Sequence, residues 1–193
     1  MKQTENNRRL IDGTICVVAQ YGMEKTTIKQ ICAQSDLHES HIYRHFGGKK
    51  QLLSNVFLSL DLELENLLVK SLPIMEFQAL PMQERYWLLF QRVWHFLLGN
   101  RDKCLCYVQY YYSPYFEDLS GKEHKRIFQP VAMKISSAFW DDVDVWMLLG
   151  NILKVMLNFA VKVHNGSMPD NESTSLQVFN AIYATVGTYF KYE

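Results

Sequence analysis

The sequence predicts an all-α fold of about nine helices. Apolar residues recur at helical spacing along most of the 193-residue chain, whereas the strict alternation that is typical of strands never persists. Dipeptides that close β-hairpins are scarce. Because 48% of the residues are apolar, the chain can bury a sizeable core, in one large domain or in a small domain followed by a larger one.

The first helix is expected over residues 4–21. Its apolar side chains fall on one stripe, and Gly22 follows it, a residue that readily takes the left-handed conformation common after a helix end. A second, shorter helix is expected to reach residue 34, because Thr27 and Gln30 have the spacing of a capping box at its start.

A four-residue turn at 35–38 leads into a third helix, expected at 39–45. Asp36 lies in this turn, and Asp tolerates the left-handed backbone region better than most residues other than glycine. Ile42 is expected to face inward. A pair of glycines then breaks the chain before a long helix at 49–70.

Five more helices are expected in the rest of the chain, separated by prolines, glycines and polar turns. Their ranges are 82–98, 101–112, 120–140, 142–164 and 172–190. Ser120 and Glu123 have capping-box spacing and are therefore expected to begin the helix at 120–140.

The cysteines and the chain's hydropathy indicate a reduced, cytoplasmic protein. Cys16 and Cys32 lie within amphipathic helical patterns, where a thiol behaves as a small apolar side chain. Cys104 and Cys106 are too close for an easy disulfide with each other and are also expected to be packing residues. The polar N-terminus leads into no signal sequence, and no uninterrupted apolar run approaches 18 residues, so no membrane contact is expected.

A net charge of zero conceals an asymmetry along the chain. Residues 1–60 carry eight Lys and Arg against five Asp and Glu, and they hold three of the six histidines, whereas the rest of the chain is acidic. A basic N-terminal end on an acidic body indicates a polyanionic partner for that end.

Two short helices joined by a four-residue turn, behind a preceding helix, form a helix-turn-helix. The second helix of such a unit enters the major groove of B-DNA, so it must be short and polar on its outer face. His38, His41 and His45 have spacings that would also suit a metal, but no carboxylate or thiol on the same face completes a ligand set. The sequence therefore favours DNA-facing histidines and no metal site.

This segment closely resembles the TetR/AcrR family of helix-turn-helix transcriptional repressors. The resemblance covers residues 8–57 without gaps, and the rest of the chain is similar to the family only in being helical and rich in aromatic residues. The positions that carry it are Gly22, Thr26-Thr27-Ile28, Ile31, the turn ending at Leu37, Ile42-Tyr43-Arg44-His45-Phe46, Lys49 and Leu52-Leu53.

The resemblance implies a role in DNA binding for each matching position. The start of the second helix would face a phosphate, the start of the third would touch base edges, and the remaining residues would reach or flank the backbone. The implied DNA-binding residues are Thr26, Thr27, Lys29, Glu39, Ser40, His41, Tyr43, Arg44, His45 and Lys49.

Three residues depart from the family pattern. Asp36 stands where glycine is usual, so the turn relies on Asp taking an unfavourable conformation. His38 stands where Ser or Thr is usual, so the third helix is expected to lose its favoured N-cap. Glu39 places an acid near DNA, where it would either accept from a cytosine amino group or be repelled by phosphate.

The resemblance also implies a boundary after residue 57, with a DNA-binding domain at 1–57 and a ligand-binding and dimerisation domain at 58–193. Most aromatic residues at 86–146 are expected in the core, and some would line a cavity for an apolar or aromatic small molecule. Three polar residues in apolar helical surroundings would each need a partner. The predicted ligand-binding residues are Trp87, Phe90, Trp94, His95, Tyr107, Gln109, Tyr110, Tyr111, Phe116 and Asn158.

The last two helices have broad apolar faces with small residues. Burial within one subunit would explain these faces, but the resemblance implies a two-fold helical bundle between subunits. A homodimer would also place two recognition helices about 34–36 Å apart, in successive major grooves.

The sequence therefore predicts a homodimeric, ligand-released repressor of a palindromic operator in double-stranded DNA, with no catalytic residues and no cofactor. One alternative is an all-α small-molecule carrier or enzyme with an incidental helix-turn-helix, although no Gly-rich phosphate loop, nucleophile–base pair or metal spacing supports it. Another is a regulator whose second domain binds a protein or nothing.

Overall fold

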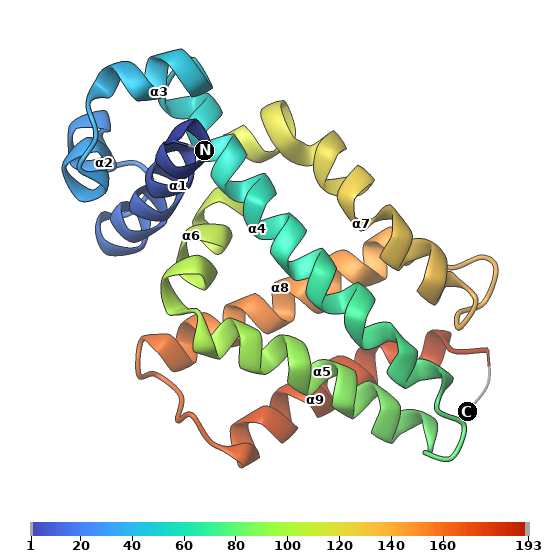
Figure 1. Ribbon diagram of the computed structural model, residues 1–193. Coiled ribbons are helices and arrows are strands. Elements are labelled where there is room, and N and C mark those ends of the chain that lie inside the picture. Colours follow the sequence, from blue (N-terminus) through green and yellow to red (C-terminus); the bar gives the residue numbers. More distant parts are fainter. Residues whose placement is uncertain (1, 192–193) are drawn as a thin grey trace. The chain divides into compact units, whose positions relative to one another are not determined.

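The computed structural model describes residues 2–191 and confirms the all-α class. These residues form nine α-helices and no strand (Figure 1). The helices are α1 Lys2–Tyr21, α2 Ile28–Ser35, α3 Glu39–Phe46, α4 Lys49–Ser71, α5 Met82–Gly99, α6 Arg101–Tyr111, α7 Gly121–Ser136, α8 Val145–His164 and α9 Glu172–Val186. Short 3-10 turns follow α4 and α9, at Leu72–Glu76 and Gly187–Tyr189.

The helix bounds near the N-terminus agree closely with the sequence, and those around residue 140 do not. The helix expected at 120–140 ends at Ser136, and the one expected from 142 begins at Val145. Asp144 explains the later start, because its Oδ1 accepts the N–H groups of Trp146 (2.9 Å) and Met147 (3.2 Å). An N-cap aspartate of this kind fixes the first turn.

Ser120 does not cap α7 as expected. A π-helical turn, Phe116–Ser120, runs directly into α7, so the helical backbone is already under way when it reaches this serine. Its hydroxyl instead contacts buried side chains of α4 and α6. Glu123, the other member of the expected box, pairs with Arg126 on the exposed side of α7.

The contacts divide the chain into two compact units. The first unit comprises residues up to Leu62 together with Asn100–Arg126, and the second comprises Glu63–Gly99 together with residues from Ile127 onward. This division reflects packing, and α4 and α7 each contribute to both units. The functional boundary expected after residue 57 stays a prediction.

In the first unit, α1 packs against α2, α3 and α6. The core here consists of fully buried aliphatic side chains, among them Leu10, Val18, Ile31, Ile42 and Leu52. α1 and α2 approach so closely at Gly13 that a Cβ there would lie 2.2 Å from Ser35 Oγ.

In the second unit, α5 packs against α8 and α9. α8 is long and apolar enough to cross a membrane by length and composition alone, and 22% of its apolar stretch is buried. It is the one such helix among residues 2–191. Most of its other apolar side chains are half-buried, and Met147 is exposed.

Candidate functional site

The start of α2 is built as the sequence predicts. Thr27 Oγ1 accepts the N–H of Gln30 (3.2 Å), and Gln30 Oε1 accepts the N–H of Thr27 (2.8 Å), which completes the capping box. Thr27 is exposed, whereas Thr26 is 1% exposed and donates its hydroxyl to the carbonyl of Gly22 (2.8 Å). Of the two threonines, Thr27 alone therefore presents its side chain to a partner at this helix end.

The turn between α2 and α3 depends on Asp36. Its φ is 51°, the one positive φ of a non-glycine among the described residues, and its N–H bonds to the carbonyl of Cys32. Arg9 of α1 supports this conformation, because its Nη2 donates to the Asp36 carbonyl and to Oδ2, each at 3.3 Å. An Asp in the left-handed region thus closes the turn where the sequence suggested it would.

His38 does cap α3, contrary to the expectation that this helix loses its favoured N-cap. His38 has an extended backbone, and its Nδ1 accepts the N–H of Ser40 at 3.3 Å. The same nitrogen lies 3.1 Å from Ser40 Oγ. An imidazole nitrogen thereby replaces the small hydroxyl that usually occupies this position.

The outer face of α3 is polar and open. Ile42 is completely buried and fixes the rotation of the helix, so that Glu39, Ser40, Tyr43 and Arg44 are exposed. Tyr43, at 57% exposure, is an unusually open aromatic side chain. Glu39 also lies in the first turn, where an acidic side chain favours the helix dipole.

His41 and His45 lie one turn apart on a half-buried side of α3. Their rings stack with centroids 6.1 Å apart. The Nδ1 atom of His41 is enclosed and has no hydrogen-bond partner. This nitrogen therefore does not face an outside partner.

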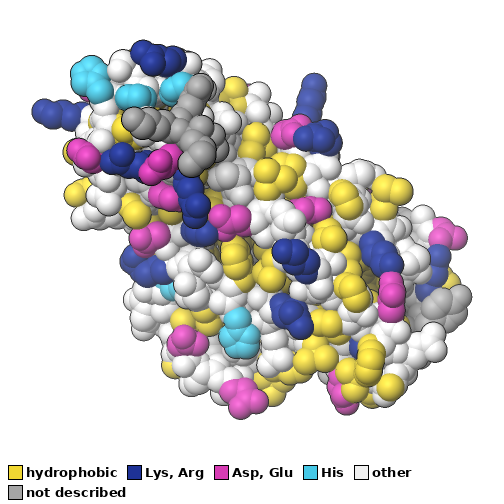
Figure 2. Space-filling view, in the orientation of Figure 1, with side chains coloured by type: hydrophobic (Ala, Val, Ile, Leu, Met, Phe, Trp, Pro, Cys, Tyr) yellow, Lys and Arg dark blue, Asp and Glu magenta, His cyan; other side chains and the backbone are white. Residues whose placement is uncertain are grey.

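Two lysines lie in or beside the helix-turn-helix. Lys29 is exposed on α2. Lys49 begins α4 and is half-buried, with its Nζ donating to the carbonyl of Met23 (3.4 Å), and burial lowers its pKa. Figure 2 shows His side chains close together over the segment that carries α2 and α3, with Lys and Arg side chains beside them, while other Lys and Arg side chains are spread over the rest of this face.

The predicted ligand-binding residues fall in two different compact units. Tyr107, Gln109, Tyr110, Tyr111 and Phe116 belong to the first unit, and Trp87, Phe90, Trp94, His95 and Asn158 belong to the second. Each unit therefore contains its own aromatic cluster.

The three polar residues thought to need a partner behave differently. His95 and Asn158 are exposed, so the expectation that they lie in apolar surroundings is wrong for this chain. Gln109 is half-buried and has protein partners: its Oε1 accepts the N–H of Met23 (2.7 Å), and its Nε2 donates to the carbonyl of Val18 (3.3 Å). Gln109 thus ties α6 to the end of α1.

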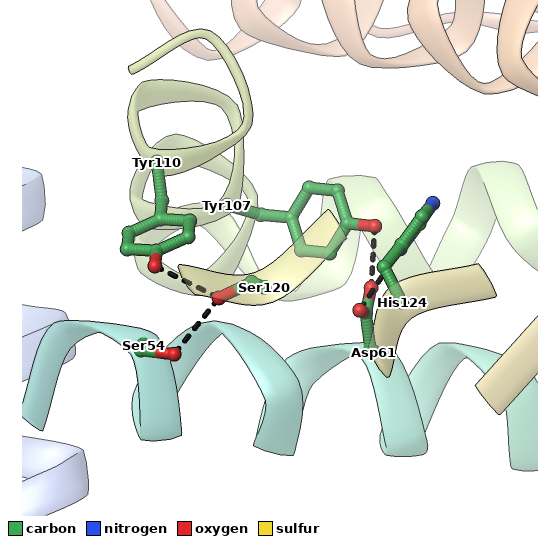
Figure 3. A network of polar contacts seen from close by, with 6 residues as sticks. All are labelled: Ser54, Asp61, Tyr107, Tyr110, Ser120 and His124. Atoms are coloured by element: carbon green, nitrogen blue, oxygen red, sulfur yellow. Dashed lines mark hydrogen bonds and ion pairs between the residues drawn. The ribbon is translucent and has the colours of Figure 1, made fainter. Parts of the chain in front are cut away.

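Two buried polar clusters join α4, α6 and the start of α7 (Figure 3). In the Ser120 cluster, Ser120 Oγ lies 2.8 Å from both Ser54 Oγ and Tyr110 Oη. In the Asp61 cluster, Tyr107 donates its hydroxyl to Asp61 Oδ1 (2.7 Å), and His124 Nδ1 lies 2.9 Å from Oδ2.

Phe57 lies between the two clusters and stacks with Tyr110 at a centroid distance of 4.7 Å. The side chain of Asp61 is 0% exposed and that of His124 is 13% exposed. Burial raises the pKa of Asp61, while the bonds from His124 and Tyr107 oppose that rise. Burial also raises the pKa of Tyr107 well above its usual range.

Sequence reasoning missed four members of these clusters: Ser54, Asp61, Ser120 and His124. A signal was present, because Ser54 and Asp61 are seven residues apart and so lie on one face of α4, within its apolar stripe. Polar residues at that spacing indicate buried partners on a neighbouring helix.

The second unit contains an aromatic cluster centred on α5. Trp87, Phe90 and Trp94 stack in succession, with ring centroids 5.5 and 5.7 Å apart, and Phe179 of α9 meets Trp87 edge-on at 5.1 Å. Trp94 is 1% exposed, yet its Nε1 has no hydrogen-bond partner. The hydroxyl of Tyr86 is also enclosed without a partner, and burial raises its pKa.

Cys104 and Cys106 are free thiols and are 2% exposed. Burial raises the pKa of each to about 12. Thiols that remain protonated at neutral pH are poor nucleophiles. Both therefore act as packing residues, as the sequence suggested.

Comparison with known proteins supports the helix-turn-helix assignment. Residues 10–56 match the family described as "Bacterial regulatory proteins, tetR family". A comparison with curated proteins finds no match.

Solved structures of TetR family regulators match nearly the whole chain. A TetR family transcription regulator from Marinobacter aquaeolei VT8 is 15% identical, with a TM-score of 0.70 over 95% of this chain and 97% of that one. The fatty acid degradation regulator FadR from Bacillus halodurans is 15% identical (TM-score 0.67, 91% and 96%). The regulator LfrR from Mycobacterium smegmatis, solved with proflavine, is 14% identical (TM-score 0.65, 95% and 95%).

The resemblance noted in the sequence is therefore confirmed: residues 10–56 match the tetR family of bacterial regulatory proteins, and the chain as a whole has the fold seen in solved structures of TetR family transcription regulators.

Proposed function

We propose that this protein is a cytoplasmic, sequence-specific DNA-binding regulator that represses transcription as a homodimer and is released by a small molecule. The exposed polar face of α3, held by buried Ile42 and by the Asp36 turn, carries the proposal. A short helix with a polar outer face is what the major groove accepts. We propose no catalytic activity and no cofactor.

The proposed DNA contacts divide into two kinds. Glu39, Ser40 and His41 would read base edges, because they occupy the N-terminal part of α3. Tyr43, Arg44 and His45, with Thr27 and Lys29 of α2, would position the protein on phosphates. Lys49 would have to exchange its contact with the Met23 carbonyl for a phosphate, and Thr26 would contribute through its backbone alone, since its side chain is buried.

We propose that the effector binds at the α5 cluster of the second unit. Two enclosed donors there, Trp94 Nε1 and Tyr86 Oη, have no protein partner, and a buried donor without a partner is costly. An apolar or aromatic molecule that carries a hydrogen-bond acceptor would satisfy them. Solved relatives of this fold include LfrR in complex with proflavine and the multidrug binding protein EbrR in complex with imidazole.

The link between effector and DNA would be α4. Its first residues lie beside the helix-turn-helix, and its later residues belong to the second unit. An effector can shift DNA affinity only as far as its own affinity differs between the two conformations.

The proposed dimer joins α8 and α9 of two subunits. Most apolar side chains of α8 are only half-buried, and Met147 is exposed. Leu176, Ala181 and Ala184 form part of an exposed stripe on α9. Small residues let helices approach closely. Sedimentation should give a dimer, and Ala184→Arg should give a folded monomer.

The decisive test of DNA binding is selection of sites from random duplex DNA by the full-length protein. Enrichment of a two-fold symmetric site is expected. Failure to enrich any such site would contradict the proposal and would favour a carrier or enzyme with an incidental helix-turn-helix.

The effector proposal has its own test, thermal melting with a panel of aromatic molecules. A true ligand at 100 times its dissociation constant adds about 2.7 kcal/mol of stability. The Trp94→Phe variant, which lacks the indole donor, should lose this response to acceptor-bearing ligands. A response that is equal in both proteins would contradict the site.

A further inference from the structure

At the start of α3, the position of the Ser40 hydroxyl proton depends on the His38 imidazole. His38 Nδ1 accepts the N–H of Ser40, so this nitrogen carries a lone pair and the imidazole proton is on Nε2. Ser40 Oγ is 3.1 Å from the same Nδ1. In this tautomer Nδ1 has no proton to give, so the Ser40 hydroxyl is the donor in the second contact and shares the single Nδ1 lone pair with the Ser40 N–H.

As a consequence, the Ser40 hydroxyl can only accept a hydrogen bond from an outside partner. A serine hydroxyl has one donor and two acceptor lone pairs, and here the donor is directed back to the helix cap. Ser40 is exposed on the outer face of α3, so its oxygen faces solvent as an acceptor. A serine hydroxyl that rotates freely in this position could act either as a donor or as an acceptor.

The neighbouring residue, Glu39, is also only a hydrogen-bond acceptor, but for a different reason. Glu39 is exposed at the first position of α3, and an ionised carboxylate only accepts hydrogen bonds. The N-terminal end of α3 therefore presents two adjacent acceptors.

In the major groove, adenine N6 and cytosine N4 carry donors, whereas guanine O6 and N7 and thymine O4 are acceptors. Resting on the DNA-binding function proposed above, we propose that His38 acts as a specificity-determining residue: by holding the Ser40 proton, it makes α3 select adenine or cytosine on the contacted strand. This preference distinguishes the chain from one with an ordinary hydroxyl cap, because a serine free to rotate would also donate to guanine and thymine.

The test begins with the symmetric site that full-length protein enriches from random duplex DNA. One position in each half-site should be A or C on the contacted strand and should lose that preference in Ser40→Ala. In one half-site, that base is then replaced by its analogue without the exocyclic amino group, purine for adenine or 2-pyrimidinone for cytosine. Binding by the wild-type protein should weaken roughly fivefold, the equivalent of one hydrogen bond, and binding by Ser40→Ala should not change.

The His38→Gly variant separates the cap from the proton. Glycine costs only a few tenths of a kcal/mol at an N-cap, yet it cannot hold the Ser40 hydroxyl. Selection with this variant should admit G and T at the contacted position, and His38→Gly should have no such effect in the Ser40→Ala background.

Three results would overturn the inference while leaving DNA binding intact: an enriched site with no Ser40-dependent preference for A or C, wild-type binding that is indifferent to loss of the amino group, or an unchanged preference in His38→Gly. Failure to enrich any site would overturn the proposed function, and the inference with it.

Discussion

The start of α3 and the contacts between α4, α6 and α7 use polar side chains in opposite ways. At α3, His38 contacts Ser40, two residues away, and both are exposed to solvent. In the Asp61 and Ser120 clusters, most of the joined side chains are 46 to 66 residues apart in sequence, and nearly all are shut away from water.

The difference teaches which polar contacts can vary and which cannot. A solvent-exposed cap can be replaced by water at modest cost in stability, so a substitution there mainly changes what the helix presents to a partner. Separating a buried carboxylate from its partners lowers the free energy of unfolding far more, because no water replaces the missing hydrogen bonds.

The largest effect is expected for Asp61→Ala. Removing this carboxylate leaves Tyr107 and His124 without their buried partner, so the free energy of unfolding should fall by about 3–5 kcal/mol. Urea denaturation would measure it. Asp12→Ala, which removes an exposed i,i+4 contact with Arg8, is the matched control and should change stability by less than about 1 kcal/mol. Similar losses in the two variants would contradict the contrast.

The next prediction uses the serine that bridges two partners. Ser120→Ala removes the partner of Ser54 and leaves the Tyr110 hydroxyl only its longer contact with the Tyr115 carbonyl (3.4 Å), so the expected loss is about 1–3 kcal/mol. Ser54→Ala is the comparison, since it leaves the contact between Ser120 and Tyr110 in place and should cost less. If Ser54→Ala were the more damaging change, the bridging role of Ser120 would be wrong.

A pH dependence follows from the raised pKa of Asp61. The folded protein holds this proton more tightly than the unfolded chain, whose Asp has a value near 3.8. The folded state of the wild-type protein is therefore most stable at low pH. Its stability falls, relative to that of the non-titrating Asp61→Asn variant, as the pH rises through the folded-state pKa of Asp61. Urea unfolding of both proteins between pH 4 and 7 would show this trend, and a constant difference across that range would argue against it.

The smallest effect is expected in the exposed turn. Asp36→Gly keeps the left-handed conformation but removes the Cβ that makes it unfavourable. It also removes an exposed contact with Arg9. The net gain should be about 0.5–1 kcal/mol. Asp36→Ala, which keeps the Cβ but cannot hydrogen-bond locally, should instead destabilise. Thermal melting of the pair would settle the sign.

The sequence by itself determined the local architecture. Helical periodicity, the capping box of Thr27 and Gln30, and the aspartate in the turn depend on residues a few positions apart, so their consequences can be read in order along the chain. The same locality makes the N-terminal segment recognisable from residues 8–57 alone.

Only the tertiary structure decided how side chains far apart in sequence meet. In the structure, Gln109 hydrogen-bonds to the end of α1, and His95 and Asn158 are exposed. Asp61 contacts Tyr107 and His124, which are far from it in sequence. A helical pattern says which face of a helix is buried, but not which helix covers it. The partners of a buried polar group are therefore fixed by packing, whereas the end of a helix is fixed by its own neighbours.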